Sequence, residues 1–505
     1  MKKKVIVIGA GAAGLASAIR LQYKGYDVEL YEKHPTPGGK MNQIEMDGYR
    51  FDLGPSLVMM PQVYREIFEY CGRDPDDYIP MEKLDPMYRV YFSDNPKEPV
   101  DVSSDMVKWT KTLESFSESD TAGFFRYLND AYKSYSFSWN NIIRRPFRKQ
   151  TDFYNLTLLK EGREAKSGIN ADQFIGRYIK DERLKQMLSF QTLYIGISPF
   201  KSPSFYTTIP MTQFLYGVWF IKGGMYTMAR SMARLFQELG GHIHYNTSVD
   251  EIVIENGKAM GVRIADEVKA ADYVVCNADF PYAMKQLVKD EPAKGKYTDK
   301  KIDKMKYSCS TLVFYLGMNR KYESVEHIHH FVFDEDLEKN MQHIFGGSKP
   351  RRASFYVYIA SKMDASLAPA GKDGLYIMMP VSNVKTAKYE WNEDTIHYYR
   401  KLILNKLKTI KGFETVEEEI VAEKHMSPLD FESTFNAYNG AVFGLMPTLL
   451  QSSHFRPQSK AKQCDNLYFN GSSTHPGAGV PIVLLSARIA AQELIQDDQG
   501  ISFGY

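Results

Sequence analysis

The sequence predicts a mixed α/β fold, α+β overall, and three observations point to it. Residues 4–8 are a β-branched run that leads directly into a glycine-rich turn at 9–14. An acidic residue, Glu32, follows at the end of the next predicted strand, and a second glycine-rich turn at 471–479 precedes a helix near the far end of the chain. A strand, a tight turn and a helix in this order form a Rossmann-like βαβ unit.

The remaining elements follow from periodicity and turn residues. Residues 13–25 predict a helix that Gly25 ends, and residues 100–200 are mostly helical in pattern. The dipeptide Asn256-Gly257 is typical of a hairpin between two strands. The predicted strands are 28–31, 242–245, 249–254, 259–264, 273–276, 308–318, 375–379 and 467–469, and a last helix covers about 481–495.

Composition bounds the class of protein. The chain has 505 residues, of which 44% are hydrophobic and 25% charged, as in a globular protein with a real core. A net charge of +2 argues against nucleic acid as a main partner. The cysteines lie far apart with no C-x-x-C pair, which argues against a disulfide scaffold or a metal site and favours a reducing cytoplasm.

Two segments raise the question of a membrane. The first twenty residues resemble a signal peptide, but the spacing of their glycines is better explained by the strand, turn and helix. The longest apolar window, 204–221, contains Pro210 and Gln213 and falls short of the roughly 20 apolar residues of a spanning helix. We therefore expect a chain that can lie on a bilayer without crossing it.

The first glycine-rich turn has the pattern G-x-G-x-x-G. Gly9 permits the tight turn, Gly11 lets a pyrophosphate approach the backbone, and Gly14 lets helix and strand pack closely. The helix N-terminus offers free N–H groups to phosphates, and Glu32 can accept hydrogen bonds from ribose hydroxyls. The turn alone does not distinguish FAD from NAD.

The next segments favour FAD. Residues 37–40 and 52–55 are glycine-rich loops where an NAD domain would usually continue with a helix, and such loops can wrap an extended flavin cofactor. Lys40 could face the pyrophosphate or the flavin, or be a solvated lysine. The second turn, 471–481, aims another helix N-terminus at the same cofactor, where it would stabilise negative charge on a reduced flavin. The residues predicted to hold the cofactor are Ile8, Gly9, Gly11, Ala12, Ala13, Gly14, Glu32, Lys33, Gly39, Lys40, Gly54, Pro55, Ser56, Val249, Gly471, Ser472, Gly479, Val480 and Pro481.

At these motifs the chain resembles the bacterial carotenoid desaturases of the phytoene desaturase type, and within them the branch that acts on C30 substrates. The resemblance covers residues 4 to about 495. It rests on GAGAAG with Glu32, PGGK at 37–40, FDLGPSLVMMP at 51–61, QTLYIGISP at 191–199, FIKGGMY at 220–226, FGLMPTLLQ at 443–451 and LYFNGSSTHPGAGVPIVLLSA at 467–487. One departure is Lys40, where the wider flavoprotein family often has Arg; this weakens bidentate contact but keeps the charge.

The resemblance implies an FAD-binding domain of the flavin amine oxidase and phytoene desaturase type, with an inserted mixed-sheet substrate domain and a helical, membrane-facing region. It implies an enzyme that removes hydrogens stepwise from an apolar C30 polyene precursor, with a quinone or oxygen reoxidising the flavin. Because both glycine-rich turns must meet at one cofactor, we predict an FAD domain from residues 1–95, 222–290 and 462–505. Residues 291–461 would form the substrate domain and 96–221 a helical insertion.

Substrate and membrane contacts are less specific predictions. The aromatic residues Phe205, Tyr206, Phe214 and Trp219 could line a tunnel or belong to an ordinary core. A basic cluster, Arg144, Arg145, Arg148 and Lys149, is flanked by Trp139, Ile142, Ile143 and Phe147. It could dock on the anionic inner face of the cell membrane, or be a solvated face. His475 is a candidate proton acceptor whose alternative is a structural hydrogen bond.

Three rival functions share the fold. A sister carotenoid oxygenase would convert terminal methyl groups to aldehydes. A flavin-dependent amine oxidase would usually place aromatic residues around the flavin, and residues 471–481 contain none. A non-catalytic protein that escorts isoprenoid-modified partners would not need the intact glycine-rich turn and Glu32.

Overall fold

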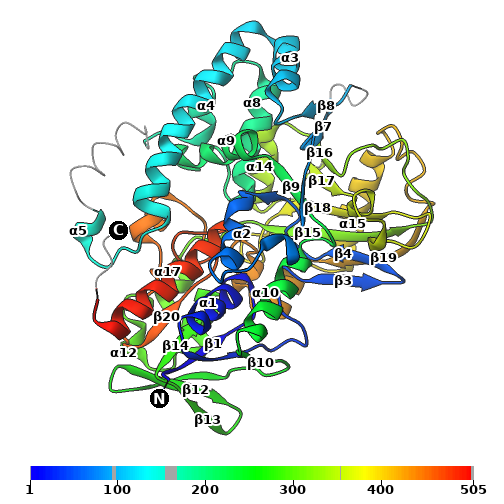
Figure 1. Cartoon of the computed structure of the whole chain (residues 1–505). Coiled ribbons are helices and arrows are strands. Elements are labelled where there is room, and N and C mark those ends of the chain that lie inside the picture. Colours follow the sequence, from blue (N-terminus) through cyan, green and yellow to red (C-terminus); the bar gives the residue numbers. More distant parts are fainter. Residues whose placement is uncertain (1, 94–97, 154–167, 353, 502–505) are drawn as a thin grey trace.

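The computed structural model describes residues 2–93, 98–153, 168–352 and 354–501. Three regions are visible in Figure 1: a parallel sheet with its helices near the N-terminus, a large mixed sheet beside it, and a helical region at the opposite end. No helix in these ranges combines the length and the apolar character that crossing a membrane requires.

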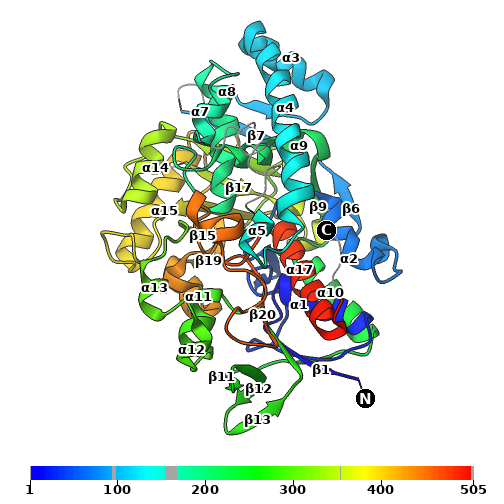
Figure 2. The ribbon, with the colours of Figure 1, turned by 90° about the vertical axis from the view of Figure 1, so that its left-hand side faces the viewer.

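The parallel sheet has the strand order β10-β2-β1-β14-β20, so strands from both ends of the chain lie side by side. Its central strands are short apolar runs, as expected of strands buried on both faces. Its elements are β1 (Lys4–Ile8), β2 (Asp27–Tyr31), β10 (His242–His244), β14 (Tyr273–Cys276) and β20 (Leu467–Phe469), with the helices α1 (Ala12–Tyr23), α10 (Tyr226–Glu238) and α17 (Val480–Gln499). Helix α1 packs between α10 and α17 (Figures 1 and 2). The predicted βαβ unit is thus confirmed, and the strand order is a finding of the structure.

The predicted Asn256-Gly257 hairpin also forms. It joins β11 (Glu251–Glu255) to β12 (Lys258–Ile264) in a separate antiparallel sheet. The sequence prediction missed the third strand, β13 (Glu267–Ala270), because it has only four residues and they are mostly exposed.

The mixed sheet has seven strands in the order β19-β15-β18-β17-β16-β7-β8. Strands β7 and β8 come from early in the chain, and β7 pairs in parallel with β16. The division of the chain into domains remains a prediction. The bounds are β7 (Tyr88–Phe92), β8 (Val100–Val102), β15 (Ser310–Met318), β16 (His329–Phe333), β17 (Phe355–Tyr358), β18 (Gly374–Val381) and β19 (Ile420–Met426), with helices α14 (Leu337–Gly346) and α15 (Glu393–Leu407).

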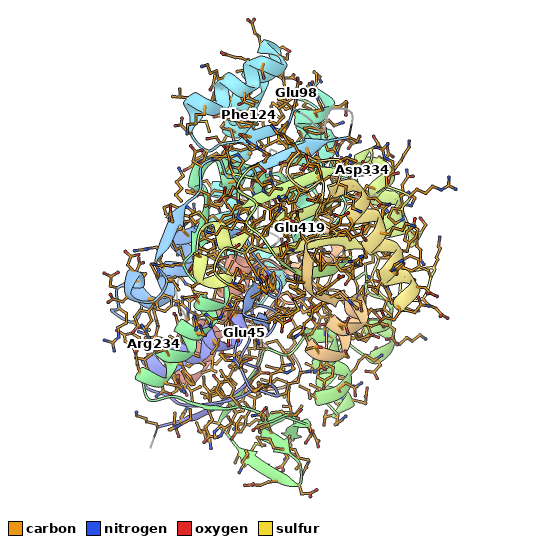
Figure 3. All side chains as sticks on the ribbon, turned by 90° about the vertical axis from the view of Figure 1, so that its right-hand side faces the viewer. Glu45, Glu98, Phe124, Arg234, Asp334 and Glu419 are labelled. Atoms are coloured by element: carbon orange, nitrogen blue, oxygen red, sulfur yellow. The ribbon has the colours of Figure 1, made fainter. Side chains whose placement is uncertain are left out.

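The helical region contains the capped helices expected from residues 100–200. The Asp105 carboxylate accepts the N–H of Val107 at the start of α3, and Ser117 caps α4. Phe124, labelled in Figure 3, lies in the core of this region, at the opposite end of the molecule from Arg234 on α10. The helices are α3 (Met106–Phe116), α4 (Glu118–Ser138), the π-turn η2 (Trp139–Ile143), α5 (Gln150–Phe153), α7 (Ala171–Ile175), α8 (Glu182–Ser189) and α9 (Thr208–Tyr216).

Smaller elements join the regions. A sheet in the order β5-β9-β6 lies beside the helical region, where β5 contacts α9, and β5 leads along the chain into α2. The remaining bounds are β3 (Gln43–Met46), β4 (Tyr49–Asp52), β5 (Val58–Met59), β6 (Met81–Lys83), β9 (Val218–Ile221), α2 (Pro61–Glu69), α11 (Phe280–Tyr282), α12 (Glu291–Lys294), α13 (Asp299–Lys304) and α16 (Pro428–Phe435).

The loop that follows β4 lies against the mixed sheet, which β4 itself contacts at β18. Tyrosine hydroxyls of the mixed sheet hold it: Tyr376 donates to Gly54 O at 2.8 Å, and Tyr356 lies 2.8 Å from Ser56 Oγ. These hydrogen bonds hold the predicted glycine-rich loop against the mixed sheet.

Candidate active site

A cavity of about 560 Å³ lies where the three regions meet. Both glycine-rich turns line it, although about 460 residues separate them in the sequence. The first turn packs tightly because its glycines lack side chains: a Cβ on Gly11 would lie 2.6 Å from Asn277 Oδ1, and one on Gly14 would lie 1.9 Å from Gly9 O. Gly14 does not line the cavity but packs the helix on the turn, as its predicted role requires.

Two helix N-termini face this cavity. Helix α1 begins after Gly11 and α17 after Gly479, and neither cap residue supplies a side-chain hydrogen bond to the first turn. The free N–H groups of both helices therefore offer donors and a partial positive charge to a bound anion.

Glu32 is fixed at the end of β2. Its carboxylate is buried and accepts the N–H of Ala10 at 2.7 Å and that of His34 at 2.9 Å. These bonds orient the two oxygens, and their remaining lone pairs can accept hydroxyl groups of a ribose.

Lys40 lies in the cavity wall, where its Nζ donates to Val442 O at 2.7 Å. Burial lowers the pKa of Lys40, and the Asp279 carboxylate opposes that shift. The ammonium of Lys40 therefore points into the cavity and is not a solvated surface group.

Nearly all residues predicted to hold the cofactor line this one cavity. They are Ile8, Gly9, Gly11, Ala12, Ala13, Glu32, Lys33, Gly39, Lys40, Gly54, Pro55, Ser56, Val249, Gly471, Ser472, Gly479, Val480 and Pro481. The sequence prediction missed Asn277 and Asp279, which also line it. The signal was available, because both follow the buried strand β14 at the same sheet edge as Gly9.

The cavity continues into an apolar branch. Phe205 and Tyr206 line it, together with Ile142, Ile143 and Ile209. Among the predicted tunnel residues, Phe214 and Trp219 do not. Phe214 packs between Trp109 and Phe124 in the helical core, and the Trp219 indole donates to Tyr216 O on the far side of β9.

His475 lies at the junction of the two parts. Its ring is 1% exposed, and Nε2 lies 3.1 Å from Ile142 O and 3.0 Å from Arg145 O. Two carbonyl acceptors require a proton on Nε2, so Nδ1 carries the lone pair, and no side chain or backbone group in the described ranges bonds it. Burial lowers the pKa of His475 to about 4, so the ring is neutral at physiological pH.

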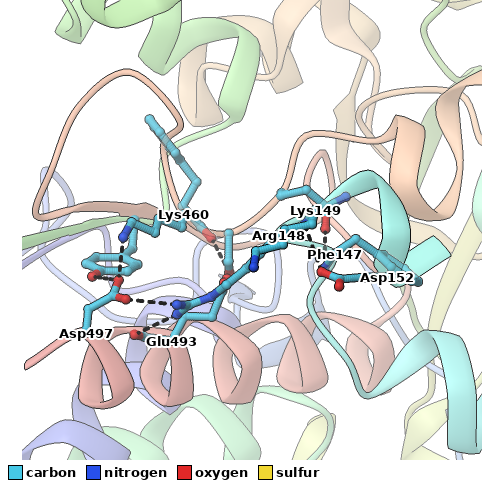
Figure 4. Close-up of polar contacts among 11 residues, drawn as sticks. Phe147, Arg148, Lys149, Asp152, Lys460, Glu493 and Asp497 are labelled. Carbon is cyan, nitrogen blue, oxygen red and sulfur yellow. Dashed lines mark hydrogen bonds and ion pairs between the residues drawn. The ribbon is translucent and has the colours of Figure 1, made fainter. Parts of the chain in front are cut away.

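The basic cluster is divided between two environments. Arg148 turns toward α17, where it pairs with Glu493 at 2.8 Å and with Asp497 at 2.9 Å (Figure 4). The Arg144 guanidinium stacks over the Trp139 ring, 5.4 Å from its centroid, and Lys149 is exposed. An internal ion pair therefore already occupies Arg148.

Comparison with known proteins agrees with this geometry. The sequence profile described as flavin containing amine oxidoreductase matches residues 12–495. A protein of Staphylococcus haemolyticus named 4,4'-diapophytoene desaturase (4,4'-diaponeurosporene-forming) is 42% identical over 496 residues, which are 98% of this chain and 99% of that protein. A Staphylococcus aureus protein of the same name is 41% identical over 503 residues, 99% of this chain and all of that one.

The chain belongs to the carotenoid desaturases of the flavin containing amine oxidoreductase family. Its cofactor is FAD, and its substrate is an apolar isoprenoid. A solved oxidoreductase of Methanosarcina mazei shares the fold of this desaturase with a TM-score of 0.67 and 19% identity, over 97% of this chain and all of that one.

The residues of this desaturase fit FAD. The two turns leave room for a pyrophosphate against bare backbone, both helix N-termini favour its charge, and Glu32 presents carboxylate oxygens at the end of β2. When bound, FAD supplies the acceptor for a hydride taken from carbon. The roles of individual residues in binding it remain predictions.

Proposed function

We propose that this desaturase converts 4,4'-diapophytoene stepwise toward 4,4'-diaponeurosporene and diapolycopene, at the cytoplasmic surface of a lipid bilayer, with a quinone or oxygen as electron acceptor. The observation that carries the proposal is the lining of the cavity, which combines two glycine-rich turns and Glu32 with the apolar side chains of the apolar branch. The names and the 42% identity of the relatives support the choice of a C30 substrate.

In this proposal, the side chains of the apolar branch hold the chain of the substrate and keep water away from the reacting carbons. Each step breaks two C–H bonds on neighbouring carbons: one hydrogen leaves as a hydride and the other as a proton. His475 is the candidate proton acceptor, through Nδ1, because Nε2 already donates to two carbonyls. Burial lowers the pKa of His475 to about 4, so Nδ1 is a weak base at neutral pH and would pass an accepted proton on readily.

The test is product analysis with purified protein. We expect an oxidised-flavin absorption spectrum, and on incubation with 4,4'-diapophytoene in liposomes and a quinone we expect products lighter by two hydrogens per step. Squalene is the control substrate, since it lacks the central double bond that starts the conjugated system. Terminal aldehydes would instead favour the oxygenase, and a colourless protein that binds the isoprenoid without converting it would favour the escort function.

Docking to the bilayer is proposed from the surroundings of the apolar branch. Leu449 and Leu450 are 53% and 73% exposed and lie between Pro447 and Ser453, which line the cavity. The 142–147 segment contacts this loop, because the rings of Phe147 and His454 lie 6.1 Å apart. An apolar tip beside basic residues is the pattern of a peripheral membrane contact.

Two multiple-substitution variants test the docking proposal. Changing Arg144, Arg145 and Lys149 to Ser, and separately Leu449 and Leu450 to Ser, should release the protein from anionic liposomes and slow turnover of liposomal substrate. Turnover of detergent-dispersed substrate should change much less. Arg148→Ser is the matched control, since it removes a charge already paired with α17. Unchanged sedimentation of both multiple variants would exclude this docking surface.

A further inference from the structure

Arg456 is a buried cation directly behind the C-terminal glycine-rich turn. Its side chain is 1% exposed, and each guanidinium nitrogen donates to backbone carbonyl oxygens. Nε donates to Thr474 O at 3.0 Å, Nη1 donates to Gln451 O at 3.0 Å, and Nη2 donates to Leu445 O at 3.0 Å and to Ser472 O. The side chain therefore ties the turn to the 445–451 loop.

The charge of Arg456 is not neutralised by direct contact. The similarly buried Arg20 pairs with Glu66, and Arg148 pairs with Glu493, but no ion pair of Arg456 occurs within residues 2–93, 98–153, 168–352 and 354–501. Burial lowers the pKa of Arg456 to about 10, so it keeps its proton at neutral pH. A buried charge held only by carbonyl dipoles is costly, and a nearby anion relieves that cost.

One carboxylate, that of Asp279, acts on both Arg456 and Lys40. Asp279 accepts Ser473 Oγ at 2.6 Å and the N–H of Tyr438 at 3.0 Å, and it interacts at longer range with both Arg456 and Lys40. Arg456, Lys40 and Asp279 together leave one net positive charge beside the C-terminal glycine-rich turn. Arg456 donates to the carbonyls of Ser472 and Thr474, and both Ser472 and His475 line the cavity. The guanidinium of Arg456 therefore lies one peptide group behind the cavity wall.

We propose that Arg456 is a positioning residue whose charge favours the reduced form of bound FAD over the oxidised form. The inference rests on the assignment of FAD to this cavity. When a substrate C–H bond breaks and its electron pair moves with the hydrogen to the cofactor, the cofactor gains one negative charge, while a proton leaves the neighbouring carbon. A fixed cation behind the wall stabilises that gained charge without any rearrangement.

The test is the midpoint potential of the holoenzyme, measured by equilibration with a reference dye during anaerobic reduction. Arg456→Gln should lower the ratio of reduced to oxidised cofactor at a given potential at least tenfold, a shift of about 30 mV for a two-electron couple. Arg456→Lys should retain most of the wild-type potential. Asp279→Asn, which removes the shared carboxylate, should shift the potential in the opposite direction.

Ser486→Ala is the matched structural control. Ser486 Oγ donates to His475 O at 2.9 Å and accepts the N–H of Gly471, so its loss loosens the same turn without changing a charge. We expect weaker retention of FAD on gel filtration but an unchanged potential. Equal potential shifts in Ser486→Ala and Arg456→Gln would overturn the inference and leave Arg456 a purely structural residue.

A second variant keeps the test decisive if Arg456→Gln fails to fold. Asp279→Asn then carries the test, and the absence of an upward shift overturns the inference. Neither result affects the assignment of FAD or of the reaction. A wild-type protein that purifies without flavin and does not take it up would overturn those assignments instead.

Discussion

At the cofactor end of the cavity the wall is mainly backbone from two glycine-rich turns, and its charged groups come from Glu32, Lys33, Lys40 and Asp279. At the other end the wall is made of apolar side chains from the α4–η2 segment, from residues 205–212 and from the mixed sheet. The first end recognises a ligand by hydrogen bonds and charge, and the second by shape and exclusion of water. Substitutions at the first end should therefore reduce FAD binding, and substitutions at the second should reduce binding of the isoprenoid.

The largest expected effect is a loss of stability on changing the helical core beside the apolar branch, compared with the same change in the branch. Phe214 is buried against Trp109 and Phe124, so Phe214→Ala should destabilise the protein by about 3–5 kcal/mol. Phe205 is half-buried and lines the cavity, so Phe205→Ala should raise KM for the isoprenoid with a much smaller loss of stability. Urea unfolding and steady-state kinetics of both variants are the measurements. The same loss of stability in both variants would mean that Phe205, like Phe214, belongs to the packed core.

At the cofactor end the matching change is Gly11→Val. The new side chain would meet Asn277 Oδ1 and occupy the path of the pyrophosphate, so FAD affinity should fall by about 3 kcal/mol, roughly 100-fold. Bound flavin is measured from absorbance after gel filtration. Gly257→Asn is the control, because an added Cβ would meet no atom within 4 Å and Asn tolerates the φ of +74° at this hairpin position. A Gly11→Val protein that retains stoichiometric FAD would contradict the assigned path.

A smaller effect is expected for Glu32→Ala. It removes a charge-assisted contact to a ribose and should weaken FAD binding by about 1.5–3 kcal/mol. Because Glu32 also holds the N–H groups of Ala10 and His34, Glu32→Gln separates charge from shape. Titration of the apoprotein with FAD distinguishes the three forms. Equal affinity of wild type and Glu32→Ala would remove this residue from the site.

The same contrast explains what the sequence could and could not predict. The cofactor end rests on short local patterns, so the turn at 9–14, Glu32 and the 471–481 turn could be placed at one cavity from spacing alone. The apolar branch has no such pattern: Phe205 and Phe214 are equally aromatic, and only tertiary packing decides which of them faces the cavity. Long-range partners such as Arg148 with Glu493 were equally invisible, since 345 residues separate them.

The mixed sheet shows the same limit. Strand β15 was predicted because it is a long apolar run, and its neighbour β18 was predicted in part. The pairing of β7 with β16 joins segments about 240 residues apart, and nothing in either segment specifies that partner. Local chemistry identifies the strands, while the order of strands is a property of the whole chain.

His475 joins the two ends, and the last prediction concerns its titration. Burial lowers its pKa from 6.5 in the unfolded chain to about 4 in the folded protein. Between these values the unfolded chain binds more protons, so the contribution of His475 to stability is complete above pH 6.5 and is lost as the pH falls toward 4. A shift of this size corresponds to about 2 kcal/mol at pH 5.

His475→Gln should therefore behave differently at two pH values. The glutamine amide can donate to Ile142 O and Arg145 O as Nε2 does, but it cannot gain a proton. Relative to wild type, the free energy of unfolding of the variant should rise by about 2 kcal/mol between pH 7.5 and pH 5, as measured by urea titration at each pH. His397→Gln, at an exposed position on α15, is the control for the His-to-Gln exchange itself. A parallel pH dependence in His475→Gln and wild type would mean that the ring is accessible to solvent protons in the folded state, and the seam between the two ends would then be open to water.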